Sequence, residues 1–518
     1  MTMRTIRWTL MTAVLGLAAC AAGLGAGDVH ADPERGGAAR PAWPPYGGAD
    51  PNDPPTAGGH DTASWGVPFF EAPSAEHCRA LPRLREVPGV QTPQPAPLPW
   101  PRGWRPRGAA PAEGGLRDGA AVEGTPAKSA RSAPATASPA PAGATHEEHR
   151  AAAPDAPQLQ AQRMPRSQER VSAGMVDDNA DFAEYLAYRQ RAAAHAVRAR
   201  DVAERYRVEV RDAAGRAVPD AELALTWPGA AHSVVWARTD AGGMAWLHPR
   251  AIVPPAVAAH ARALEVQVRH GQQLARAPML RGQKHAVQLS LRAPAEVPAH
   301  SRLDLVFLVD ATGSMGDEIH KLKTSLHDIA DQIAALPSRP DLCFALVAYR
   351  DHGDAFVLRT HDFTHRLDAF QGALDRLHAA GGGDYPEALN EALYETVHRL
   401  AWRGDGAQRM VVLVADAPPH LHRGGVAYDA TLAAALAKGI KLFAVGASGL
   451  DAQGEYVFRQ MAQYSGGRFV FLTYRDARHP GRGPGTETTH DVSNYSVDSL
   501  DQLIVRLVRE ELARRPQA

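Results

Sequence analysis

The sequence is short of cysteine and of net charge, and each shortage excludes a class of protein. Three cysteines in 518 residues, Cys20, Cys78 and Cys343, are too few for a disulfide-rich scaffold or a cysteine-based structural zinc site. Cys78 lies in a proline-rich segment and Cys343 in a strand with a buried pattern, so we do not expect them to pair. The 56 Lys and Arg residues nearly balance 57 Asp and Glu residues, which gives no indication of a nucleic-acid partner. The length suggests two to four domains.

The first 31 residues have the pattern of an export signal. Arg4 and Arg7 precede a short apolar run, and small residues follow it. Two processing routes remain open. Residues 17–20 resemble the bacterial lipoprotein signal, in which Cys20 would be lipidated, whereas cleavage after Ala31 would release a soluble secreted protein. Either route predicts an exported protein outside the cytoplasm. The first route predicts an outer-membrane or periplasmic lipoprotein of the cell envelope, with membrane contact only through the N-terminal lipid anchor.

The segment from residue 32 to residue 170 is rich in proline, alanine and glycine. Of the 41 prolines in the chain, 25 lie between Pro33 and Pro165. Such a composition buries too little apolar surface to offset the entropy of ordering, so we expect a disordered linker. The next segment, 171–205, is predicted to be helical, with the apolar residues of the helix clustered near its start, from Phe182 to Tyr188.

Residues 206–292 alternate between apolar and polar side chains, with turn residues between the alternating stretches. This pattern predicts a small all-β sandwich. The turn sequences at 215–221 and 237–244 resemble those of carboxypeptidase-regulatory-like (transthyretin-like) modules of exported bacterial proteins. The resemblance implies a role in spacing or binding.

Continuous apolar runs characterise the region 303–515 and alternate with helical stretches. Such runs are typical of strands covered on both faces, and the alternation predicts an α/β fold with a doubly wound, mostly parallel sheet. In that fold the binding crevice lies at the carboxyl ends of the strands. The predicted strands are 305–309, 342–347, 411–414, 442–445 and 469–472, and the predicted helices are 317–335, 367–379, 386–402, 428–438, 451–463 and 498–514.

Oxygen-bearing side chains follow the predicted strands where that crevice should lie. Asp310, Thr312 and Ser314 follow the first strand, Glu387 stands where a helix begins, and Asp416 ends a later strand. Hydroxyls and carboxylates without cysteine favour a hard cation, Mg²⁺ or alternatively Mn²⁺ or Ca²⁺. A lone Asp at Asp310 would be explained as a helix N-cap, but acidic residues at three separate loops favour a metal site.

The pattern Asp310-x-Thr312-x-Ser314 resembles the metal-ion-dependent adhesion site of von Willebrand factor type A (VWA) domains, over about 303–515. The other loops are similar to those of the I-like domain of integrin β subunits. The resemblance implies that Glu387 binds the central metal directly and that Asp416 supports it through water.

The same resemblance implies two flanking metal sites. Asp351 and Asp384 match acidic residues of one flanking site, although Gly382 stands where the family has an asparagine. Asp317 and Glu318 match the adjacent site on the other side. Acids in the first turn of a helix are also favourable to its dipole, so that alternative stays open for this pair.

Histidines are frequent in this region, but their spacing does not match a zinc motif. None forms a His-x-x-x-His pair with a neighbouring glutamate on a predicted helix. We therefore interpret them as solvated loop residues. They are His320, His352, His361, His365, His420 and His422.

In the family that this region resembles, one coordination position of the metal is filled by a carboxylate of the ligand. The sequence thus predicts a divalent-cation-dependent protein-binding or adhesion module at the bacterial cell envelope, without enzymatic activity. Its expected partner is a protein that presents an acidic residue. The alternatives are a metal-dependent, phosphatase-like hydrolase and a scaffold that binds no ligand. The sequence makes no prediction of the oligomeric state.

Overall fold

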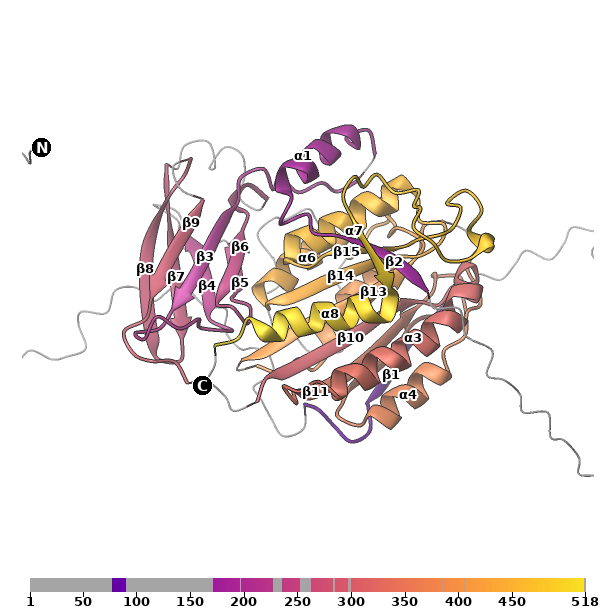
Figure 1. Cartoon of the computed structure of the whole chain (residues 1–518), viewed down its shortest axis with the longest axis horizontal. Helices are drawn as coiled ribbons and strands as arrows, with labels where there is room; N and C mark the ends of the chain where they lie inside the picture. The colour runs from indigo at the N-terminus through magenta and orange to yellow at the C-terminus, as the bar shows by residue number, and fades with distance from the viewer. Residues whose placement is uncertain are drawn as a thin grey trace, which may run out of the picture.

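A computed structural model of the chain describes residues 77–89, 171–195, 197–226, 235–251, 262–282, 285–296, 300–383, 385–404 and 406–516. The predicted export signal, with Cys20, and most of the predicted linker lie outside these residues. Within the described ranges, no helix is long and apolar enough to cross a membrane. Figure 1 shows a small β domain, residues 206–290, beside a larger α/β domain.

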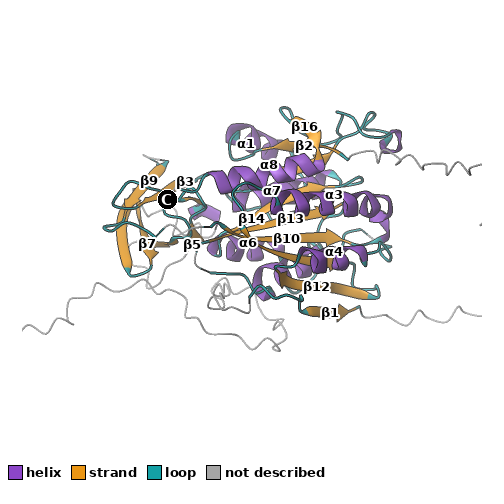
Figure 2. Ribbon diagram, turned by 60° about the horizontal axis from the view of Figure 1, so that its bottom comes forward, coloured by secondary structure: helices purple, strands orange, loops and turns teal. Residues whose placement is uncertain are grey.

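The α/β domain is built on one nine-stranded sheet. Five central strands run parallel to one another. At each edge two further strands are added, and each of these pairs antiparallel with the strand before it. The sheet is therefore mixed, and the prediction of a mostly parallel sheet holds only for its centre. Figure 2 shows the two edges on opposite sides of the domain. The strand order is β1 (Leu84–Pro88), β12 (Phe356–Thr364), β11 (Asp341–Tyr349), β10 (Arg302–Asp310), β13 (Ala407–Ala415), β14 (Ile440–Gly446), β15 (Phe469–Leu472), β2 (Ser172–Val176) and β16 (Ser496–Ser499).

Helices cover both faces of the sheet because the central strands are apolar on both. On β10, Phe307 packs against Phe370, with ring centroids 5.5 Å apart, while its neighbour Leu308 belongs to the core on the other face together with Leu432. All the predicted helices are present, with shifted ends. The first face carries α3 (Gly316–Ala334), α4 (Leu367–Asp375) and α8 (Leu500–Ala513), and the second carries α5 (Leu389–Tyr394), α6 (Tyr428–Ala437) and α7 (Ala452–Ser465).

Part of the predicted linker is folded onto this domain. Strand β1 pairs with β12 at the edge of the sheet, and Cys78 forms a disulfide with Cys343 of β11, with a Cα–Cα distance of 5.8 Å. Arg85 of β1 also pairs with Asp362 at 2.9 Å. The predictions that 32–170 is a linker throughout and that the two cysteines do not pair are therefore wrong. The two cysteines lie 265 residues apart, so no local pattern reveals their contact.

The segment 171–205 also differs from its prediction. It contains the expected helix, α1 (Phe182–Arg191), but strand β2 precedes that helix and lies between β15 and β16. Gly174 allows this close pairing, since a Cβ atom there would lie 2.4 Å from the ring of Phe471. The helical prediction is wrong for residues 172–176.

The β domain consists of a three-stranded and a four-stranded sheet that share one buried core. Its alternating strands place apolar residues inward, as in β3, where Val208 and Val210 are fully buried. The first sheet contains β6 (Met244–Leu247), β3 (Tyr206–Arg211) and β9 (Ala286–Ser290), and the second contains β5 (Val235–Arg238), β4 (Glu222–Thr226), β7 (Ala263–His270) and β8 (Gln273–Leu280).

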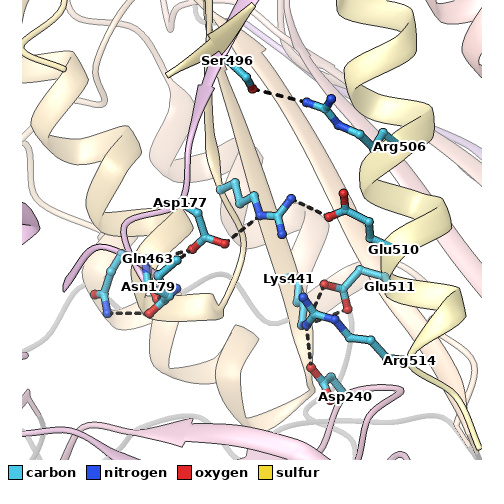
Figure 3. A network of polar contacts seen from close by, with 12 residues as sticks. Asp177, Asn179, Asp240, Lys441, Gln463, Ser496, Arg506, Glu510, Glu511 and Arg514 are labelled. Atoms are coloured by element: carbon cyan, nitrogen blue, oxygen red, sulfur yellow. Dashed lines mark hydrogen bonds and ion pairs between the residues drawn. The ribbon is translucent and has the colours of Figure 1, made fainter. Parts of the chain in front are cut away.

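Buried ion pairs join the two domains at the amino ends of β13 and β14. Lys441 Nζ contacts Asp240 of the β domain at 2.9 Å and Glu511 of α8 at 2.7 Å (Figure 3). Arg409 Nη1 donates to Asp220 of the β domain at 2.9 Å. The β domain therefore packs against the end of the sheet opposite to the carboxyl ends of the parallel strands.

Candidate metal centre

The site begins at the turn that follows β10. Asp310 is fully buried at the end of this strand, and its Oδ1 accepts hydrogen bonds from the amide and hydroxyl of Thr312, at 2.9 and 2.7 Å. The Thr312 hydroxyl lies 3.1 Å from that of Ser314, which is exposed. The strand order reverses here, because β10 lies between β11 and β13, and such a switch point leaves a crevice at the strand ends.

A glycine loop forms the second wall of the site. Gly313 N donates to Gly381 O at 2.9 Å, and Gly382 N donates to the carboxylate of Asp354, at 2.9 Å from Oδ2. Gly381 has a φ of +78°, and a Cβ there would lie 2.2 Å from Asp354 Oδ1. The close approach of this loop to Asp354 therefore requires glycine.

The third wall carries Glu387 and Asp416, which are 3% and 6% exposed. Glu387 N donates to Pro418 O at 3.1 Å, which holds the start of α5 against the turn after β13. A Cβ on Gly382 would lie 3.2 Å from both Glu387 Oε1 and Thr312 Cβ. The loops after β10 and before α5 thus meet at the Glu387 carboxylate.

The electrostatics show that the three carboxylates share one buried space. Burial, and after it the charge of Asp416, together raise the pKa of Asp310 to about 7. Burial also raises the pKa of Tyr349, and the charges of Asp310, Asp416 and Glu387 add to that effect. Buried like charges are unfavourable unless a cation neutralises them.

The donor set fits a hard divalent cation. Asp310 Oδ2 is buried and has no hydrogen-bond partner among the described residues. The surrounding groups of the site supply carboxylate and hydroxyl oxygens without sulfur, which are the ligands that Mg²⁺, Mn²⁺ and Ca²⁺ prefer. Asp310, Thr312, Ser314, Glu387 and Asp416 would hold the ion.

Of the residues predicted for the two flanking metal sites, the structure describes the side chain of Asp351 alone. Asp384 and the side chains of Asp317 and Glu318 lie outside the described residues. Asp351 is described, and its carboxylate faces a histidine: Asp351 Oδ1 lies 2.7 Å from His420 Nε2.

This contact corrects the interpretation of the histidines as solvated. His420 and His352 are half-buried, and His352 Nε2 lies 3.1 Å from Glu391 Oε1. His361 in β12 is also half-buried, and burial lowers its pKa to about 4. The interpretation holds for His365 and His422, which are exposed in loops, whereas His320 is exposed but lies on α3.

Two supporting residues were not identified from the sequence. Asp354 holds the glycine loop, and Arg350 donates to Ala311 O at 3.0 Å and to His378 O at 2.8 Å. Arg350 thereby ties the end of β11 to the chain on both sides of the site. Neither residue belongs to a periodic pattern, although the stretch of charged residues 350–354 directly after a buried strand could have drawn attention to this loop.

Comparison with known proteins identifies the domain that carries the site. Residues 304–477 match the family model of the von Willebrand factor type A domain, so this part of the chain is a VWA domain. A mouse protein, von Willebrand factor A domain-containing protein 7, is 39% identical over 89 residues, which are 17% of this chain and 9% of that protein. The chain thus matches only about a tenth of that curated relative's length.

Two solved structures illustrate the range of similar proteins. A von Willebrand factor type A protein from Catenulispora acidiphila is 14% identical, with 57% of this chain and 51% of that chain covered and a TM-score of 0.29. The pilus adhesin SpaC from Lactobacillus rhamnosus GG is 14% identical, with coverages of 49% and 32% and a TM-score of 0.27.

Proposed function

We propose that the VWA domain is a divalent-cation-dependent protein-binding module. The observation that carries this proposal is the enclosed set of oxygens around Asp310, whose carboxylate is buried beside that of Asp416. A cation held there offsets the repulsion between the carboxylates. Mg²⁺ is the proposed ion, with Mn²⁺ and Ca²⁺ as alternatives.

The ligand in this proposal is a protein that presents an acidic side chain. Magnesium keeps octahedral geometry and retains exchangeable water ligands, and a carboxylate can replace one of these waters. Ser314 is exposed at the rim, and Tyr385, two residues before Glu387, is 47% exposed. An exposed aromatic residue beside a metal-bound carboxylate suits protein binding, since tyrosine is enriched at protein interfaces.

We further propose that the protein acts outside the cytoplasm, at the cell envelope. The disulfide between Cys78 and Cys343 supports this location, because such bonds persist mainly in oxidising compartments. A lipid on Cys20 would anchor the chain, and the residues before Cys78 would set the reach of the VWA domain. The described β domain packs at the opposite end from the site and so does not itself cover the metal face.

We propose no catalytic activity for the domain. The histidines nearest to the site, His352 and His420, contact carboxylates rather than a serine or cysteine nucleophile. The alternative, a phosphatase-like hydrolase, would be favoured if the wild type turned over a phosphoester substrate and Asp310→Ala did not.

A binding screen of the full-length oxidised chain tests the proposal. Immobilised protein is exposed to a panel of purified extracellular proteins in Mn²⁺, in Mg²⁺ and in chelator, with Asp310→Ala as the matched variant. We expect at least one partner that binds the wild type only with cation and is displaced by a short acidic peptide. Metal binding without any cation-dependent partner would contradict the adhesion proposal and favour the scaffold.

A further inference from the structure

A second cluster of metal-ligating side chains lies next to the central site. Asp351 and His352 are in the loop between β11 and β12, and His420 is in the turn after β13. One ligand atom from each of the three residues lies within 4.8 Å of the other two. Asp351 is buried and both histidines are half-buried, so the cluster is not a set of freely solvated groups.

Hydrogen bonds fix the backbone that carries two of these three side chains. His420 O accepts a hydrogen bond from Asn390 Nδ2 at 2.6 Å, and Asn390 Oδ1 accepts from Tyr428 N at 2.8 Å. Asp351 N donates to Asp354 Oδ2 at 3.0 Å. The backbone at Asp351 and at His420 is thus fixed by residues outside the cluster.

Two buried atoms of the cluster lack a hydrogen-bond partner among the described residues. They are Nε2 of His352 and Oε2 of Glu391. The Glu391 carboxylate approaches His352 through its other oxygen, Oε1, at 3.1 Å, without the alignment of a hydrogen bond. Buried polar atoms in native proteins are nearly always satisfied, so these two atoms have the capacity to bind a further partner.

The shortest distance between ligand atoms in the cluster is close to the spacing in a small transition-metal site. The 2.7 Å contact is a hydrogen bond in which Asp351 Oδ1 accepts from His420 Nε2 when that nitrogen carries the proton. A tetrahedral zinc ion with bonds of about 2.0–2.1 Å would hold two ligand atoms about 3.3 Å apart. Replacing the proton of this hydrogen bond by the metal therefore requires the two atoms to move apart by only about 0.6 Å.

The ligand types separate this cluster from the central site. Two imidazoles and a carboxylate favour Zn²⁺ and similar first-row metals, whereas carboxylates and hydroxyls favour Mg²⁺. Metal-bound histidines usually have a carboxylate on the other ring nitrogen. Glu391 lies 3.1 Å from His352 Nε2, so it supplies that carboxylate if the metal binds Nδ1 of His352, and it is placed as a fourth ligand if the metal binds Nε2. We propose that Asp351, His352 and His420 form a zinc-type metal site beside the central site, with Glu391 as its supporting carboxylate.

Cobalt titration of the full-length, chelator-treated protein tests this proposal. Co²⁺ bound to imidazoles in a four- or five-coordinate site absorbs strongly in the visible range, whereas octahedral Co²⁺ bound only to oxygen absorbs weakly. We expect strong absorption that saturates near one equivalent and disappears when Zn²⁺ is added. His352→Ala and His420→Ala should each weaken binding at least tenfold.

Three controls make the result specific. His422→Ala removes an exposed histidine two residues from His420 and should leave the absorption unchanged, as should Asp310→Ala, which removes the central site. X-ray absorption of the zinc-loaded wild type should show about two imidazole ligands, a readout that does not depend on whether the variants fold. Strong absorption that survives in the double variant His352→Ala/His420→Ala, the loss of absorption in Asp310→Ala, or only oxygen ligands around zinc would each overturn the proposal.

Discussion

Lys441 provides the most quantitative test of how the two domains are joined. Its ammonium group lies 2.9 Å from Asp240 Oδ2 and 2.7 Å from Glu511 Oε2, and its side chain is only 13% exposed. Burial alone would lower the pKa of Lys441, but the charges of Glu511 and Asp240 raise it above its usual value. Lys441→Met removes this cation and leaves the two carboxylates facing each other.

The expected cost follows from the burial of the partners. Asp240 and Glu511 are 5% and 8% exposed, and Arg514, which is 37% exposed, remains as their partner at 3.3–3.4 Å. At these distances each contact of Lys441 is worth about 6 kcal/mol of Coulomb attraction at an effective dielectric constant of 20, before the cost of desolvation. Removing one partner of a buried pair typically costs about 3–5 kcal/mol, and we expect a loss in this range for Lys441→Met.

Urea unfolding of the oxidised full-length chain measures the effect. Arg506→Met is the matched control on α8, because its 3.9 Å contact with Asp498 is largely exposed and should be worth less than about 1 kcal/mol. Since Asp240 belongs to the β domain and Glu511 to α8, Lys441→Met should also separate the unfolding of the two domains into distinct transitions. A loss no greater than that of Arg506→Met would refute the reasoning.

Three further predictions concern the disulfide and the central site. Cys78→Ser should lower the unfolding free energy by about 2–5 kcal/mol and speed amide exchange in β1. Unchanged exchange would contradict this, because it would show that pairing with β12 alone holds β1 on the sheet. Asp354→Ala frees the amide of Gly382 and should weaken Mg²⁺ binding, measured by calorimetry, about 10- to 100-fold; an unchanged affinity would contradict its positioning role. In chelator, the raised pKa of Asp310, about 7 against 3.8, means that its stabilising contribution is complete below about pH 4 and is lost as the pH rises through 7. Melting temperatures from pH 4 to 8 should fall more steeply for the wild type than for Asp310→Asn, and parallel curves would contradict this.

The centre of the VWA fold could be predicted because its information is local. Strands β10, β11, β13, β14 and β15 are continuous apolar runs, and strands buried on both faces require such runs. The flanking strands carry no comparable pattern. In β1 all but one residue are exposed, and β2 pairs with β15 across almost 300 residues of chain, so only the folded sheet defines them.

The central site followed from topology, whereas its surroundings did not. Once the parallel strands are placed, Asp310 and Asp416 must meet at their carboxyl ends. The contact between Asp351 and His420 depends instead on how two irregular loops fold toward each other. No spacing rule relates residues on separate loops, which is why the histidines were interpreted as solvated.

The central claim is that Asp310 and its neighbours bind a divalent cation. The most direct test is the melting temperature of the full-length, chelator-treated chain during titration with Mg²⁺, Mn²⁺ and Ca²⁺, beside Asp310→Ala. The full chain is needed because β1 and β2, which complete the sheet, precede the VWA segment. We predict a saturable rise in the wild type, because a ligand that binds only the folded state stabilises it by mass action, and no rise in the variant. An equal rise in both proteins, or none in either, would contradict the account.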